Sequence, residues 1–274
     1  MVFLPGSGEV SPENNYAALA RKMALPQVAS LVLLGSHTLP FDLGYAWFQE
    51  MDYTTGETLH MASPLRLSSL SLSVSQVVSL VLDLSKSLPM ESIFLLGFSS
   101  GANIAMSVAR EIRAKGGGRR MGGVVCVCGG MDGGGGSSGR EGGGGEDCDK
   151  DGITPVLQIL GDKDSTYPSS FAEASKLEYG EAGMTCKVIK GKGHEMIKSE
   201  EQVEVLFDFI SDKLAMQVSQ TGFVRGRPKA MQISSRRRLA FIDAYTVLTS
   251  TTRCRRLRDC AKGEDNEITN IAHK

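Results

Sequence analysis

Short apolar runs alternate with longer amphipathic segments along the first 215 residues of the chain. Runs with almost no polar positions are typical of strands in a parallel sheet that is covered on both faces. The runs predict six buried strands, at residues 2–4, 28–34, 93–96, 123–128, 155–160 and 184–189.

Helical spacing of apolar residues appears between and after these runs. Apolar side chains recur at helical intervals from Leu70 to Leu84, and Pro89 ends that pattern. A second apolar stripe covers residues 203–214, with Glu200 and Glu201 at its start, where the helix dipole favours negative charge. The alternation predicts an α/β fold with a mainly parallel central sheet and helices on both faces.

Periodicity fails after Leu214, and the charge changes sign there. Residues 1–215 hold 18 Lys and Arg against 26 Asp and Glu, whereas residues 216–274 hold 12 against 5. The formal net charge of −1 therefore averages an acidic body and a basic extension. We predict a domain at 1–215, with no nucleic-acid partner, and a disordered extension at 216–274 whose partner the sequence does not specify.

Glycine is concentrated in one stretch of the domain. Sixteen of the 32 glycines lie between residues 116 and 145. Because glycine runs have high backbone entropy and no side chains to pack, they favour flexible surface segments. We predict a disordered insertion at about 129–150.

The sequence gives little support for a membrane-spanning protein, a secreted protein or a metal-binding protein. No apolar run approaches the roughly 20 residues that span a bilayer, and we find no secretory signal. The six cysteines form no C-x-x-C pair. We therefore expect a cytoplasmic protein with reduced thiols and no metal site.

The segment at 97–101, Gly-Phe-Ser-Ser-Gly, is a G-x-S-x-G motif between a predicted strand and a helix-forming segment. This context predicts a nucleophile elbow, a tight turn that exposes Ser99 Oγ at the carboxyl end of the strand. The N–H of Ser100, at the start of the helix, is then placed to stabilise negative charge on a carbonyl oxygen.

A serine nucleophile requires a base, and the base requires a carboxylate to orient it. His194 follows the last predicted strand in a glycine-rich loop, which makes it the candidate base. Asp162 and Asp164 follow the strand at 155–160. We assign Asp164 as the orienting acid and Asp162 to the turn, which gives the chain order serine, aspartate, histidine.

A second oxyanion donor is expected in the loop after the first strand. Pro5 has no N–H, whereas the glycines at positions 6 and 8 permit close approach of the backbone to a substrate. The backbone N–H of Ser7 is therefore the candidate.

Five segments together resemble the phospholipase/carboxylesterase family, which includes the acyl-protein thioesterases and lysophospholipases. They are residues 3–8, 46–48, 97–101, 157–164 and 193–194. The resemblance implies an α/β-hydrolase fold and hydrolysis of thioesters or carboxylic esters without a cofactor. It carries Ser99, Asp164 and His194 over as a catalytic triad, with Ser7 and Ser100 as oxyanion donors.

Aromatic and apolar residues after the second strand are candidates for an acyl pocket. We expect Leu39, Trp47 and Phe48 to contact substrate, with burial of Trp47 in the core as the alternative. The implied substrates are acylated proteins, lipids or small esters, which would bring the protein into peripheral contact with membranes.

Two positions depart from the family pattern. Pro5 stands where the family usually has histidine, and Ser100 stands where it usually has glutamine. Two alternatives therefore stay open. One is a hydrolase of another acyl bond, in a peptide or a dienelactone. The other is a catalytically impaired binding module whose basic extension recruits an acidic partner.

Overall fold

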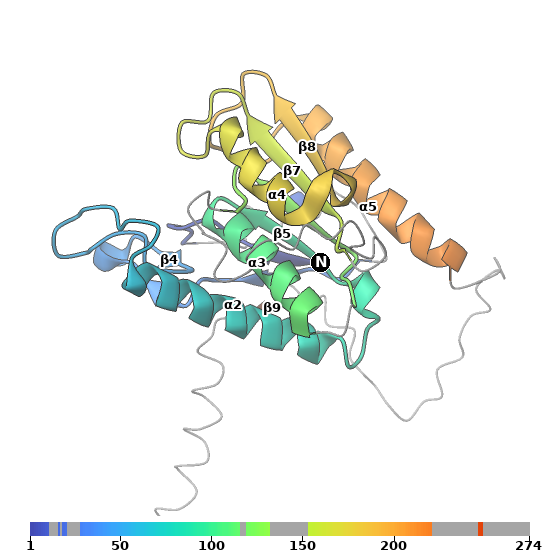
Figure 1. Cartoon of the computed structure of the whole chain (residues 1–274), viewed down its shortest axis with the longest axis horizontal. Coiled ribbons are helices and arrows are strands. Elements are labelled where there is room, and N and C mark those ends of the chain that lie inside the picture. The colour runs from blue at the N-terminus through green and yellow to red at the C-terminus, as the bar shows by residue number, and fades with distance from the viewer. Residues whose placement is uncertain are drawn as a thin grey trace, which may run out of the picture.

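A parallel sheet of seven strands forms the centre of the fold (Figure 1). The computed structural model describes residues 1–10, 16, 18–20, 28–115, 119–131, 153–220 and 246–248. The strands, in the sheet order β8-β7-β6-β5-β1-β2-β9, all pair in parallel. They are β1 (Val2–Leu4), β2 (Leu31–Leu33), β5 (Phe94–Phe98), β6 (Gly123–Val127), β7 (Val156–Gly161), β8 (Met184–Ile189) and β9 (Thr246–Leu248). The predicted parallel sheet is confirmed.

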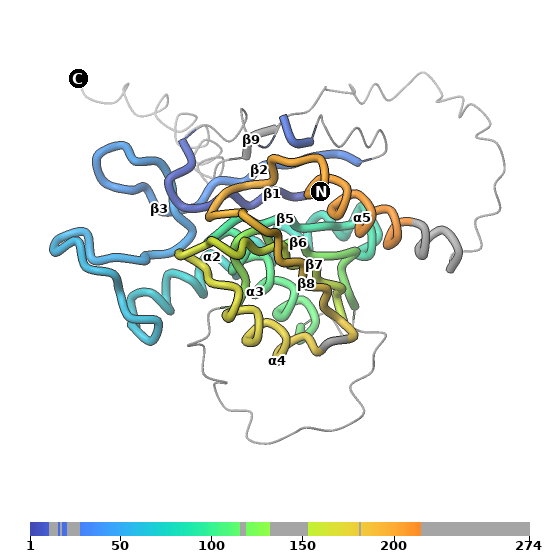
Figure 2. The backbone as a smooth tube through the Cα atoms, turned by 90° about the horizontal axis from the view of Figure 1, so that it is seen from above, coloured from blue at the N-terminus to red at the C-terminus, as the bar shows by residue number. Residues whose placement is uncertain are grey.

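Helices cover both faces of this sheet (Figure 2). One face carries α2 (Pro64–Leu84), α3 (Ser100–Lys115) and α4 (Ala172–Gly183), and the other carries α5 (Glu200–Gln220). The apolar stripe on α5 explains its position, because Leu206 and Ile210 are fully buried beneath it. The predicted arrangement of helices on both faces is confirmed.

A small antiparallel hairpin lies between β2 and α2 and was not predicted. It pairs β3 (His37–Thr38) with β4 (Tyr45–Ala46), and a 3-10 helix (Pro40–Asp42) connects the two. Two further 3-10 helices cover Met90–Ser92 and Ser169–Phe171. Strands of two residues are too short to show an alternating pattern, so the sequence could not indicate them.

Two predicted boundaries differ from the structure, and the predicted extension contains a strand. Gly129 and Gly130, expected in the disordered insertion, are buried, and a Cβ at Gly129 would lie 2.4 Å from the Ser99 carbonyl oxygen. Helix α5 continues to Gln220, and β9 pairs with β2, so parts of the predicted extension are ordered. The rest of the extension, and residues 132–150 of the insertion, lie outside the described residues.

Helix α2 is apolar and long enough to cross a membrane, with a mean hydropathy of 1.5, which corrects our sequence-based expectation that no such segment exists. In the fold, Val77 and Val81 are buried in the core cluster that also contains α3. The helix therefore packs as a layer of the domain, while Leu65 and Leu72 on it stay about half exposed.

Candidate functional site

Ser99 lies on a sharp turn between β5 and α3. Its φ of 52° is in the left-handed region, which costs energy for any residue other than glycine. The turn is held because Ser99 N–H donates to the Val127 carbonyl oxygen at 3.0 Å. The two flanking glycines are required by space: a Cβ at Gly97 would lie 2.3 Å from the Gly101 oxygen, and one at Gly101 would lie 2.0 Å from the Leu4 oxygen. This turn has the geometry of a nucleophile elbow.

His194 joins Ser99 to Asp164 by hydrogen bonds. His194 Nε2 lies 2.9 Å from Ser99 Oγ, and His194 Nδ1 lies 2.9 Å from Asp164 Oδ2. The three side chains come from the loops after β5, β7 and β8, at the carboxyl ends of the strands. They have the mutual geometry of a nucleophile, a general base and the carboxylate that orients the base.

The environment of Asp164 favours its ionised form. Burial of the side chain acts to raise the pKa of Asp164, but hydrogen bonds from the Tyr167 N–H and from His194 lower it further than burial raises it. The ionised carboxylate can therefore accept a hydrogen bond from His194 Nδ1–H. Asp162, which we assigned to the turn, accepts a hydrogen bond from the Gly191 N–H at 2.6 Å and ties the β7 loop to the loop that carries His194.

The two residues predicted to supply the oxyanion donors are in contact through their side chains. Ser7 Oγ and Ser100 Oγ are 2.9 Å apart, which brings the loop after β1 against the start of α3. The main-chain N–H groups of Ser7 and Ser100 have no hydrogen-bond partner within the described residues. Neither N–H is therefore occupied by a protein acceptor in the part of the chain that the structure describes.

Comparison with known proteins finds similarity in structure only. No protein-family model and no curated protein matches the sequence. Among solved structures, esterase PE8 matches with 18% identity and a TM-score of 0.56, over 77% of this chain and 90% of that one. SOBER1 of Arabidopsis thaliana matches with 17% identity and a TM-score of 0.51 (78% and 97%), and the Bacillus cereus carboxylesterase with 16% and 0.53 (77% and 87%).

The chain has the α/β-hydrolase fold. This confirms the fold that the resemblance in sequence implied. At these identities the likeness extends to the fold, so the roles of individual residues rest on their geometry.

Trp47 and Phe48 do not lie where we expected in this α/β-hydrolase fold. Their side chains are 4% and 1% exposed and belong to the hydrophobic core, so the structure favours the core interpretation. The Trp47 Nε1–H donates to the Pro5 carbonyl oxygen at 2.6 Å, and the Arg66 guanidinium lies over the Phe48 ring. Leu39 is half-buried at the start of the hairpin loop.

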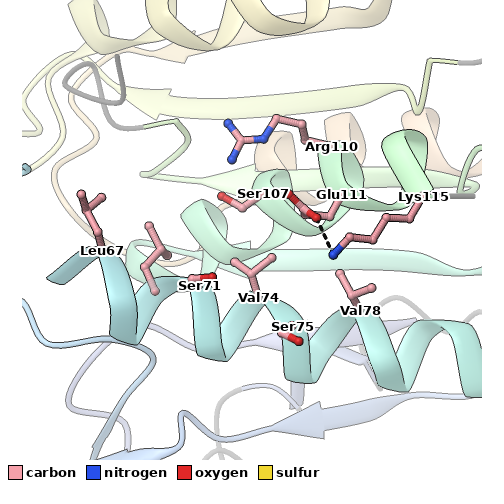
Figure 3. A pocket seen from close by; sticks show the side chains of 10 residues that line it. Leu67, Ser71, Val74, Ser75, Val78, Ser107, Arg110, Glu111 and Lys115 are labelled. Carbon is pink, nitrogen blue, oxygen red and sulfur yellow. Dashed lines mark ion pairs between the residues drawn. The ribbon is translucent and has the colours of Figure 1, made fainter. Parts of the chain in front are cut away.

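A groove of about 310 Å³ between α2 and α3 lies away from this site (Figure 3). Val74 and Val78 line it on α2, while Arg110 and Lys115 line it on the second half of α3. Since Ser100 is the first residue of α3, the groove is remote from Ser99.

Cys128 was missed as part of the site. Its φ of 49° turns the side chain away from the face that Cys126 occupies, and the two cysteines belong to opposite core clusters. Cys128 Sγ lies 3.4 Å from the Glu195 oxygen and 3.5 Å from the Gly193 oxygen, on either side of His194. Its position at the carboxyl end of a strand beside the elbow strand is the only indication that the sequence offers.

The Cys128 thiol also lies close to the Asp164 carboxylate and the His194 imidazole. Donor atoms of Cys128, Asp164 and His194 all lie within 4.8 Å of one another, a set that could hold a metal ion. Burial raises the pKa of Cys128 to about 11, so the thiol is protonated at neutral pH and can donate a hydrogen bond. Metal binding would require its deprotonation and would compete with the hydrogen bond between His194 and Asp164.

Replacement of Cys128 by alanine is expected to lower kcat about tenfold, because the loop that holds His194 loses its contacts at the backbone oxygens of Gly193 and Glu195. Steady-state kinetics on a chromogenic ester measures the loss. Cys126→Ala is the matched control, since it removes the same atoms from the same chain segment but faces the opposite core cluster. Equal kcat values for the two variants would show that Cys128 serves packing alone.

Proposed function

We propose that this protein is a serine hydrolase that cleaves carboxylic ester or thioester bonds, as acyl-protein thioesterases, lysophospholipases and carboxylesterases do. The observation that carries the proposal is the unbroken series from Ser99 Oγ through the His194 imidazole to the Asp164 carboxylate, with both heavy-atom distances at 2.9 Å. As in the family that the sequence resembles, the reaction would need no cofactor.

The geometry supports a two-step reaction through an acyl-enzyme. His194 Nε2 accepts the Ser99 Oγ proton while Oγ attacks the acyl carbonyl carbon. The N–H groups of Ser7 and Ser100 bind the oxygen that becomes negative, and His194 then gives its proton to the departing alcohol or thiol. A water molecule that His194 deprotonates releases the acid and restores Ser99. Throughout, the Asp164 carboxylate accepts a hydrogen bond from His194 Nδ1–H and stabilises the imidazolium.

Apolar side chains beside the oxyanion loop support an acyl substrate. Phe41 and Leu43, in the hairpin loop, are 92% and 61% exposed. This loop adjoins the oxyanion loop, because the Gly8 N–H donates to the Tyr45 oxygen at 2.9 Å. Exposed apolar side chains in a loop beside the oxyanion loop suit the alkyl chain of an acylated protein, a lipid or a small ester.

A fluorophosphonate probe tests the proposal, since it labels only an activated serine. We expect the unsubstituted protein to be labelled and to hydrolyse p-nitrophenyl butyrate, and the Ser99→Ala variant to do neither. Rates of hydrolysis of oxyesters, thioesters, peptides and dienelactones then show which kind of acyl bond the protein cleaves. If the protein shows neither labelling nor turnover above Ser99→Ala, the binding-module alternative takes its place.

A further inference from the structure

The loop that carries Ser7 is held along one side by the segment 45–50, which we name the brace. Three hydrogen bonds connect the two. The Gly8 N–H donates to the Tyr45 oxygen at 2.9 Å, the Trp47 Nε1–H donates to the Pro5 oxygen at 2.6 Å, and the Ser7 hydroxyl donates to Glu50 Oε2 at 2.6 Å. The oxyanion loop is thus tied before, at and after Ser7.

The brace itself is fixed to two elements of the domain. The Gln49 N–H donates to Ser69 Oγ on α2 at 3.0 Å, and the Ser73 hydroxyl on the same helix donates to the Trp47 oxygen. After β2, the brace packs so closely that a Cβ at Gly35 would lie 2.2 Å from the Ala46 carbonyl group. The brace is therefore firmly attached to the domain, although only two of its residues, Tyr45 and Ala46, form a strand.

The oxyanion loop needs such a support. Pro5 has no N–H to anchor it, Gly8 has a φ of 86° that only glycine adopts readily, and Ser7 is exposed. An oxyanion donor acts only when its position is held to a fraction of an ångström. Side-chain packing cannot supply that precision for an exposed turn.

The direction of the hydrogen bonds at Ser7 extends the support across the site. Because the Ser7 hydroxyl donates to the Glu50 carboxylate, its oxygen accepts the hydroxyl proton of Ser100, 2.9 Å away. The series from Ser100 through Ser7 to Glu50 therefore links the residues of both oxyanion donors. Glu50 ends this series with a group that only accepts.

We propose that Trp47 and Glu50 are positioning residues, which act through Pro5 and Ser7 to hold the Ser7 N–H in the oxyanion hole. This inference rests on the proposed function. It gives Trp47 a role other than contact with the substrate, and it places part of the support for the hole at Glu50, 43 residues away from Ser7 in sequence.

The test compares variants that remove or keep the brace's side of these hydrogen bonds. Glu50→Ala removes the acceptor and Glu50→Gln keeps one, while Trp47→Phe keeps a buried ring without the N–H. Loss of a whole oxyanion donor costs about 100-fold to 1000-fold in kcat, so we expect about tenfold for Glu50→Ala and Trp47→Phe, with KM unchanged. Affinity for a trifluoromethyl ketone, which mimics the tetrahedral intermediate, should fall with kcat, and Glu50→Gln should retain most of both.

A double-mutant cycle separates positioning from general effects of structure or charge. In a Ser7→Ala background, which keeps the N–H but lacks the hydroxyl, Glu50→Ala should have no further effect on kcat. Glu57→Ala is the control, because Glu57 is an exposed carboxylate in the following loop. Thermal melting verifies that every variant is folded.

Two outcomes would overturn the inference in different ways. If fluorophosphonate labels the unsubstituted protein but Glu50→Ala keeps full kcat and ketone affinity, or loses as much in the Ser7→Ala background, the brace does not position the hole. If the unsubstituted protein is not labelled at all, the proposed function fails and the catalytic role of the brace fails with it.

Discussion

Replacement of Ser99 by glycine is expected to abolish turnover while leaving the protein more stable than the Ser99→Ala variant. Loss of the nucleophile should reduce kcat by a factor on the order of 10⁴ to 10⁶ in both variants. Alanine keeps the Cβ that makes a φ of 52° costly, whereas glycine adopts this conformation freely. We expect the free energy of unfolding of Ser99→Gly to exceed that of Ser99→Ala by about 1 kcal/mol.

Urea unfolding of the two variants, followed by circular dichroism, measures the difference. Ser107→Gly is the control for glycine itself, because Ser107 is a buried residue inside α3 with no left-handed φ. There, Ser107→Gly should be about 1 kcal/mol less stable than Ser107→Ala. If Ser99→Gly is also less stable than Ser99→Ala, the elbow does not store strain.

The catalytic residues could be predicted from the sequence because each lies in a short segment with a recognisable local pattern. The glycines of the elbow and the loops that follow strands 155–160 and 184–189 fixed Ser99, Asp164 and His194 as candidates. Parallel strands place their carboxyl ends at one edge of the sheet, so residues distant in sequence could be expected to meet.

Contacts that depend on the backbone conformation of a single residue, or on how the elements pack, could not be predicted from these local patterns. Period-two alternation places Cys126 and Cys128 on the same face, and the left-handed φ at Cys128 reverses this. Apolar residues such as Trp47 and Phe48 occur both in acyl pockets and in hydrophobic cores, so their residue type could not separate the two interpretations. The helix α4 was missed because its apolar residues follow no clear helical stripe.

Replacement of Gly101 by alanine is expected to destabilise the domain by about 3 kcal/mol, at the upper end of the cost of overpacking. A Cβ at this position would lie 2.0 Å from the Leu4 oxygen and 2.5 Å from the Pro5 oxygen. Both atoms belong to the backbone of β1 and the loop after it, which cannot rotate away as a side chain can. Helix α3 would have to move from β1 and carry Ser100 with it. Chemical denaturation gives the loss of stability, and ester hydrolysis should fall with it.

Gly193→Ala is the matched control for crowding, since no heavy atom beyond the two neighbouring residues lies within 4 Å of a Cβ there and no left-handed φ is needed. Its free energy of unfolding should stay within about 0.5 kcal/mol of that of the unsubstituted protein. Equal stability of the two variants would mean that α3 does not pack against β1 as closely as the structure shows.

The sequence distances across the site have a consequence for folding. Ser7 meets Ser100 across 93 residues, and Ser99 meets His194 across 95. Closing such long loops is slow, so these contacts form only after β1, β5, β7 and β8 have joined one sheet. During refolding, helical circular dichroism should therefore return before the protein can react with a fluorophosphonate. Reactivity with the fluorophosphonate would therefore mark the last stage of folding, when the loops after β1, β5 and β8 have come together at one edge of the sheet.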